Sequence, residues 1–298
     1  MPKVVVGLLN DQQDFQKMQA ADARAAAARA GLDVEVVFAD SNAVLQIQQL
    51  FRFVHAPEGE RPAAIVVETV TGEGLERVAR NAVRAGIGWM LVNGSGRYID
   101  GLRQERPDLP IANVAIDNVE VGRIQARQVR ALAPGGGLVL CVQGPAENAA
   151  ATERLDGLRE ALGDGFELKV LNGDWTEQSG EKALAAWLRL KTSEGFHPCV
   201  VAVQNDTMAV GARRAIRAHR REWSEVPVTG CDGLPEGGQR LVRAGELAAT
   251  IVTPTTAGQA VALVGRALVG ERVAAEVRLA PRSFPPEDEL GRKARGAR

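Results

Sequence analysis

The chain has 298 residues, of which 45% are hydrophobic and 24% charged, and its formal net charge is −1. This composition is typical of a globular protein, and the length suffices for two domains of ordinary size. The near-neutral charge excludes a global attraction to nucleic acid or to an anionic membrane. No apolar run reaches the roughly 20 residues of a membrane-spanning helix. We therefore expect no membrane insertion, and no nucleic-acid binding by this chain alone.

The first residues and the cysteines bear on the cellular compartment in which the protein acts. Met1-Pro2-Lys3 leads directly into the apolar residues 4–6, without the charged and apolar regions of a secretion signal. This favours a cytoplasmic protein or a trimmed chain. The cysteines, Cys141, Cys199 and Cys231, lie in or beside apolar segments and lack the spacing of metal ligands. We expect small buried hydrophobic side chains there, with no metal site.

Short apolar segments alternate with amphipathic or alanine-rich segments along nearly the whole chain. We predict strands at 4–9, 34–38, 64–68, 89–92, 138–142, 167–171, 200–203, 226–230 and 248–252. We predict helices near 14–30, 43–55, 73–85, 118–132, 152–162, 178–191, 207–220, 235–244 and 256–269. Strict alternation with short connections is typical of an α/β fold with parallel sheets covered by helices on both faces.

The predicted strands outnumber those that one compact α/β unit needs, so we divide the chain. A polar, proline-containing loop is predicted at 100–112, close to the first boundary. Two further crossings are predicted, at 253–256 and at 281–286. The basic segment 291–298 is interpreted as a solvated, frayed tail.

Polar residues stand at the ends of two predicted strands. Asn205 follows strand 200–203, and Asp232 follows strand 226–230 and precedes Gly233. In open α/β sheets, ligands bind at the carboxyl ends of the strands. An amide and a carboxylate suit vicinal hydroxyl groups, and no nucleophile or base stands beside them. These residues favour a binding protein for a small sugar or polyol, although each of them also suits a helix cap or a turn.

Five motifs occur in order between residues 116 and 251. They are IDN at 116–118 with Gly122, GDWT at 173–176, QNDTMAVGA at 204–212, GCDG at 230–233 and GELAATI at 245–251. With these motifs the chain resembles the periplasmic sugar-binding proteins of the ribose-binding class. Their type I periplasmic-binding-protein fold is shared with the effector domains of lac-repressor-type regulators.

The resemblance implies two doubly wound parallel-sheet lobes, joined by three crossovers, with hinge closure around a ligand in the cleft between them. It implies an N-terminal lobe of 1–116 plus 254–283 and a C-terminal lobe of 117–253 plus 284–290. It also implies a periplasmic location, a sugar or polyol ligand, a membrane transporter or sensor as partner, and no cofactor.

The resemblance extends to individual ligand positions. It implies that Gln13 and Phe15 bind the ligand from the first lobe, and that Trp175 stacks on it from the second. Asn205 and Asp232 match the amide and carboxylate ligands of the family. An aromatic ring covers the C–H face of a sugar, while amides and carboxylates bond its hydroxyl groups.

Three further ligand positions depart from the family pattern. Asn93, followed by Gly94, stands where the ribose binders have Asp-Arg. Thr152 stands at another arginine position, and Thr253 at a glutamine position. Two guanidinium groups, with the bidentate recognition they offer, are therefore missing from these positions. We do not expect ribose itself; a larger or differently substituted polyol, or a positively charged ligand, remains open.

Enzymatic function is not predicted. The first strand is not followed by GxGxxG, and the sequence contains no GxSxG elbow and no Walker lysine. The leading hypothesis is a solute receptor of a sugar transport or sensing system. The alternatives are the effector domain of a lac-repressor-type regulator without its DNA-binding headpiece, or a detached sensor module.

Overall fold

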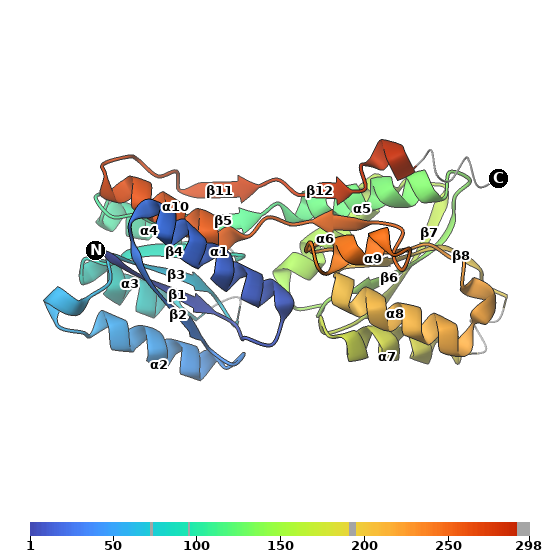
Figure 1. Cartoon of the computed structure of the whole chain (residues 1–298), viewed down its shortest axis with the longest axis horizontal. Helices are drawn as coiled ribbons and strands as arrows, with labels where there is room; N and C mark the ends of the chain where they lie inside the picture. Colours follow the sequence, from blue (N-terminus) through green and yellow to red (C-terminus); the bar gives the residue numbers. More distant parts are fainter. Residues whose placement is uncertain (72–73, 95, 191–194, 291–298) are drawn as a thin grey trace. The chain divides into compact units, whose positions relative to one another are not determined.

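The computed structural model describes residues 1–71, 74–94, 96–190 and 195–290. The predicted basic tail and the end of the helix predicted at 178–191 lie outside the described residues. The chain divides into two compact units (Figure 1). Unit 1 contains residues 1–116 and 254–279, and unit 2 contains residues 117–253 and 280–298. The chain therefore passes from one unit to the other three times.

Unit 1 is built around a six-stranded sheet in which every neighbouring pair is parallel. Its order is β11-β5-β4-β3-β1-β2. The strands are β1 (Lys3–Leu8), β2 (Asp33–Phe38), β3 (Ala64–Glu68), β4 (Gly88–Val92), β5 (Ile111–Ile116) and β11 (Glu276–Leu279). The central strands read as continuous apolar runs because both faces of this sheet are covered.

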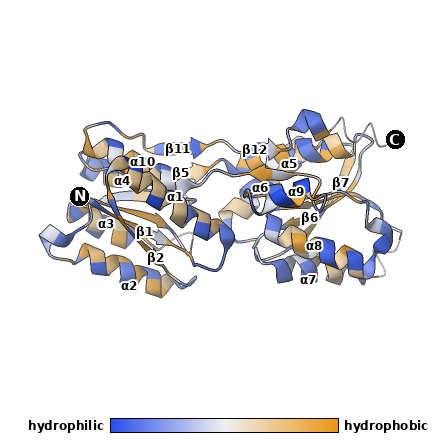
Figure 2. Cartoon of the chain, in the orientation of Figure 1, coloured by the Kyte–Doolittle hydropathy of each residue, from blue (hydrophilic) through white to orange (hydrophobic). Residues whose placement is uncertain are grey.

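Successive side chains of β1 enter different cores. Val4, Val6 and Leu8 pack with α1 (Asp14–Ala30) and α10 (Thr256–Leu268). Val5 packs on the other face, with α2 (Ala43–Val54), α3 (Glu76–Arg84) and α4 (Tyr98–Glu105). Figure 2 shows β1 in the hydrophobic colours. The two-residue period of a strand thus supplies apolar side chains to both helical layers.

Unit 2 repeats this architecture with a smaller sheet. Its four-stranded parallel sheet has the order β7-β6-β8-β9, and β10 and β12 form a separate antiparallel pair. The strands are β6 (Gly137–Gln143), β7 (Phe166–Asn172), β8 (Pro198–Val203), β9 (Val228–Thr229), β10 (Thr250–Val252) and β12 (Arg282–Phe284). The helices are α5 (Asn118–Leu132), α6 (Ala149–Leu162), α7 (Glu177–Leu188), α8 (Asp206–His219) and α9 (Gly238–Arg243).

The α/β class with parallel sheets in two units is confirmed, but the loop predicted at 100–112 is wrong. This segment contains most of α4, and β5 begins at Ile111. Ile99 and Leu102 are buried at helical spacing. Arg103 donates to the main-chain carbonyl oxygens of Ile111 and Val273. The polar residues and prolines mark only the turn between the helix and the strand.

The described helices include none long and apolar enough to cross a membrane. This finding agrees with the hydropathy of the sequence.

Helices α5 and α6 approach each other so closely that glycines are required at their contact. A Cβ atom on Gly157 would meet the carbonyl oxygen of Val119, and one on Gly122 would meet that of Arg154. We expect Gly157→Ala to lower the free energy of unfolding by about 1–3 kcal/mol through overpacking. Urea denaturation followed by circular dichroism measures this change.

Gly101 provides the matched control, because it lies inside α4 with open space around its Cβ position. Gly101→Ala is expected to raise the free energy of unfolding by about 0.5–1 kcal/mol, since alanine restricts the unfolded chain. Equal effects of the two alanines would contradict the close-packing argument.

Candidate functional site

The predicted ligand residues of unit 2 follow strands of the unit, as expected for an α/β sheet. Asn205 follows β8, Asp232 follows β9, and Thr253 follows β10. Hydrogen bonds join these residues and Trp175 in two pairs, and the main-chain N–H of Asp206 links the pairs by donating to the Cys231 carbonyl oxygen at 2.6 Å. Asn205 Nδ2 donates to the carbonyl oxygen of Trp175 at 3.0 Å, and the Thr253 main-chain N–H donates to that of Asp232 at 3.2 Å. These four predicted residues therefore belong to one polar cluster of unit 2.

Asn205 is 7% exposed and caps α8. Its Oδ1 accepts from the main-chain N–H of Met208 at 2.8 Å. The capping alternative is thus realised by Asn205, and the amide keeps one N–H that these two bonds do not use.

Asp206, the next residue, is a buried carboxylate that sequence reasoning did not place in the site. It accepts from the Thr250 hydroxyl at 2.7 Å and from the Gly233 main-chain N–H at 2.8 Å. Burial and the neighbouring charge of Asp232 raise the pKa of Asp206, while these hydrogen bonds and Arg154 oppose the shift. Asp206 thereby ties the loop that carries Asp232 to β10.

Arg154 is the principal correction to the sequence analysis. It is 7% exposed on α6, and it donates from Nε to Asn118 Oδ1 at 3.0 Å and from Nη1 to the Gln204 carbonyl oxygen at 2.7 Å. Its guanidinium carbon lies 5.7 Å from the centre of the Trp175 ring. Burial raises the pKa of Asp232 to about 7, and the positive charge of Arg154 opposes this shift. Unit 2 therefore retains a buried guanidinium group beside its carboxylates.

Thr152 lies outside this cluster. It is exposed in the first turn of α6, where its hydroxyl donates to the carbonyl oxygens of Ala146 and Asn148, each at 3.2 Å. No described hydrogen bond connects Thr152 with the other predicted ligand residues of unit 2. Arg154 stands two positions later in the sequence. A helix of 3.6 residues per turn points the two side chains in different directions.

Trp175 and Asp232 share an unusual backbone conformation. Their φ angles are 71° and 99°, in the region that non-glycine residues rarely adopt. The Trp175 ring lies against Gly144, where a Cβ atom would collide with it. Trp175 also packs on the edge of the hydrophobic core of unit 2. Its ring is therefore held in place from several sides.

In unit 1 the predicted residue Asn93 lies beside a carboxylate that the sequence analysis missed. Asn93 follows β4 with a φ of 54°, and its Oδ1 accepts from the Thr256 hydroxyl at 2.9 Å. Glu68 ends the neighbouring strand β3 and accepts from Gln16 Nε2 at 3.0 Å. Burial raises the pKa of Glu68 to about 6, and the Gln16 and Asn93 amides partly oppose this shift.

Gln13 and Phe15 lie at the beginning of α1, in the same unit. Gln13 is the N-cap residue, and its side chain makes no capping hydrogen bond. Phe15 is half-buried and is not among the hydrophobic side chains that pack in either core of this unit. Both therefore stay candidates for ligand contacts.

Of Glu68 and Arg154, which the sequence analysis missed, only Glu68 stands in a sequence pattern that indicates a binding residue. Glu68 follows the apolar residues 64–67, so the strand-end reasoning used for Asn205 and Asp232 applied to it equally. Arg154 carried no such signal, because an arginine inside an amphipathic helix ordinarily faces solvent.

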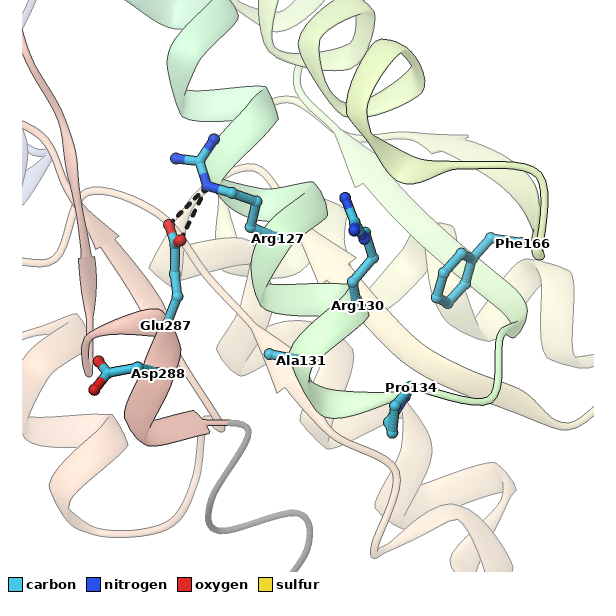
Figure 3. A pocket seen from close by; sticks show the side chains of 7 residues that line it. All are labelled: Arg127, Arg130, Ala131, Pro134, Phe166, Glu287 and Asp288. Carbon is cyan, nitrogen blue, oxygen red and sulfur yellow. Dashed lines mark hydrogen bonds and ion pairs between the residues drawn. The ribbon is translucent and has the colours of Figure 1, made fainter.

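A pocket of about 570 Å³ lies elsewhere in unit 2, between the last turns of α5, the first residue of β7 and residues 287–288. Arg127 in this pocket is paired with Glu287 at 3.0 Å (Figure 3). No predicted ligand residue lines it. Among the described residues, no group of histidine, cysteine, aspartate and glutamate side chains is arranged to hold a metal ion.

Comparison with known proteins gives a consistent family. The family model described as periplasmic binding protein domain matches residues 4–272. The ribose import binding protein of Salmonella typhimurium is 35% identical over 170 residues, which cover 56% of this chain and 55% of that protein. The xylitol-binding protein of Mycolicibacterium smegmatis is 29% identical over 192 residues, which cover 63% and 50%. The chain thus spans about half the length of these relatives.

Solved structures show the same fold. The periplasmic binding protein component of the arabinose ABC transporter from Shewanella sp. ANA-3 superposes with a TM-score of 0.82 and 20% sequence identity. The superposition covers 99% of this chain and 95% of the other. The expected type I fold is thereby confirmed.

The raised pKa of Glu68 makes stability depend on pH. The pKa of the Glu68 carboxyl group is about 6 in the folded chain, against an ordinary value of 4.5. The protonated group therefore contributes stability that is fully present below pH 4.5 and is lost as the pH rises through 6. We expect Glu68→Gln to raise the free energy of unfolding at pH 7.5 by roughly 1–2 kcal/mol and to change it little at pH 4.

Urea denaturation at the two pH values measures this difference. Asp40→Asn is the control, because Asp40 is an exposed carboxylate two residues beyond β2 and its φ of 50° suits asparagine. A Glu68→Gln variant that is less stable than the wild type at pH 7.5 would show that the folded chain favours the ionised carboxylate.

Proposed function

The chain belongs to the periplasmic binding protein family, and on that premise we propose that it is a non-catalytic receptor for a small sugar or polyol. The polar cluster of unit 2 contributes to ligand affinity. The receptor acts in the periplasm and delivers its ligand to a membrane transporter or sensor. Family membership and the binding functions named for the relatives support this proposal.

The observation that carries the proposal is the position of backbone strain. In the described part of the chain, five non-glycine residues have a positive φ: Asp40, Ser41, Asn93, Trp175 and Asp232. Three of these five are ligand residues implied by the family resemblance. Such conformations cost of order 1–3 kcal/mol each and persist where the surrounding structure requires them, often at binding sites. A tryptophan gains nothing locally from this conformation, so the backbone strain at Trp175 supports a role in binding.

The chemistry of the cluster in unit 2 suits a polyhydroxylated ring. Trp175 offers an aromatic face for C–H groups. Asp232 accepts hydrogen bonds from hydroxyl groups. Arg154 keeps Nη2 as a donor, since its Nε and Nη1 already serve Asn118 and Gln204. A ligand hydroxyl that bridges Asp232 and Arg154 would form charge-assisted bonds to both.

A thermal-shift screen followed by titration calorimetry tests the proposal. The panel contains pentoses, hexoses, inositols, linear polyols and amino sugars. A ligand of the folded state raises the unfolding midpoint, and the rise grows with ligand concentration. We expect Asp232→Asn and Trp175→Ala each to weaken binding of the hit about tenfold or more, because each removes a contact with the ligand.

Asp164→Asn is the matched control, since it neutralises an exposed carboxylate in the turn before β7 of the same unit. This variant is expected to bind like the wild type. A folded wild type that binds no member of the panel contradicts the proposal, and so does a hit that Asp232→Asn and Trp175→Ala both retain at full affinity.

A further inference from the structure

Glu68 occupies the central position of the carboxyl edge of the sheet in unit 1. It is the last residue of β3, which lies between β1 and β4. In the strand register it stands opposite Val92, directly before Asn93. The residue is only partly buried, and it lies at the edge of the sheet where ligands of open α/β sheets bind.

Gln16 is oriented so that its amide nitrogen faces Glu68. The Gln16 Oε1 atom accepts from the Leu9 main-chain N–H at 3.1 Å, and Nε2 donates to Glu68 Oε2 at 3.0 Å. The Leu9 bond requires an acceptor on Gln16, which determines which end of the amide is the oxygen. Glu68 therefore receives a neutral donor from this side.

Asn93 is oriented by a second chain of hydrogen bonds. Gln19 Oε1 accepts from the main-chain N–H of Ala257, so Gln19 Nε2 donates to the Thr256 hydroxyl at 2.9 Å. That hydroxyl must then donate its own proton to Asn93 Oδ1, at 2.9 Å. The oxygen of Asn93 is thus committed, and its buried Nδ2 atom, which has no hydrogen-bond partner in the described part of the chain, is the group left beside Glu68.

Glu68 has no cationic partner in the part of the chain that the structure describes. No described ion pair involves Glu68, whereas many other carboxylates of unit 1 have one, for example Glu35 with Lys3 and Asp14 with Lys17. The carboxylates of unit 2 have Arg154 nearby. A partly desolvated carboxylate with neutral donors only is incompletely compensated, and a cation compensates it best.

The other charged residues that follow the strands of unit 1 are exposed to solvent. Asp11 and Asp40 are exposed residues shortly after β1 and β2, along the same edge of the sheet. Of the basic residues on the neighbouring segments, Lys17 is paired with Asp14, and Arg97 is exposed before α4. Salt and solvent screen such exposed charges, so the missing cationic partner of Glu68, and not the general charge of this edge, favours a positively charged ligand group.

We infer that Glu68 binds a protonated amino group, so that the ligand is an amino-substituted sugar or cyclic polyol. This inference rests on the proposed function and specifies its ligand class. The competing role of Glu68 is a carboxyl group that bonds a neutral hydroxyl.

Titration calorimetry at pH 7 with matched ligand pairs tests the inference. Each pair differs by one amino group: glucosamine and glucose, galactosamine and galactose, and scyllo-inosamine and scyllo-inositol. N-acetylglucosamine and N-acetylgalactosamine are uncharged controls for the two hexosamines. We expect at least one amine to bind more tightly than its neutral partner. Glu68→Gln should weaken that amine about tenfold or more, because the glutamine amide cannot replace the charge.

Asp40→Asn controls for the general charge of this edge and is expected to leave the amine affinity within about twofold, since exposed charges are screened by salt. The thermal midpoint of each variant without ligand verifies folding. If neutral polyols bind as tightly as their amines, or if Glu68→Gln weakens both members of a pair equally, the inference is wrong while the proposed function stands. If no sugar or polyol of either kind binds the folded wild type, both fall together.

Discussion

Parallel strands end at the same edge of their sheet, and the rest of this structure depends on that constraint. The segments that follow the strands receive no further pairing partners there, so polar side chains that follow different strands meet at one edge. In unit 1, Glu68 and Asn93 meet in this way. In unit 2, Asn205 and Asp232 follow neighbouring strands of the parallel sheet, and Thr253 follows β10, which a parallel bridge between Asp232 and Val252 joins to the segment after β9. The apolar strands behind them form the rigid support that a binding site requires.

The two units treat their carboxylates differently. In unit 2, Asp206 receives two hydrogen bonds and Arg154 supplies a positive charge to the cluster. In unit 1, Glu68 accepts one amide hydrogen bond, from Gln16, lies beside the Asn93 amide, and has no described ion pair. Desolvation of a carboxylate is only partly offset by neutral donors. The two units therefore differ in the groups that offset the desolvation of their carboxylates: a guanidinium group in unit 2 and neutral amides in unit 1. This difference, and not the number of acidic groups, determines which ligand chemistry suits each unit.

Several side chains of the proposed site also have structural roles. Asn205 caps α8, and its amide nitrogen also donates a hydrogen bond to the main-chain carbonyl oxygen of Trp175. Arg154 holds Asn118 and the end of β8, and its guanidinium faces the Trp175 ring. A binding residue whose rotamer is already held by packing loses little conformational freedom when the ligand arrives. Capping and binding are therefore compatible roles for the same residue here.

The sequence by itself determined the α/β class, most of the strands and helices, and the residues that follow the strands, because apolar runs and their polar ends are local patterns. It did not reveal α4 and β5, whose apolar residues are interrupted by Asp100, Pro107 and Pro110 and become a core only against neighbouring elements. Nor did it reveal the burial of Arg154 or the orientation of Gln16 beside Glu68. Burial and hydrogen-bond partners arise from contacts between segments far apart in the chain, so only the tertiary structure decided which polar side chains lose their water and what compensates them.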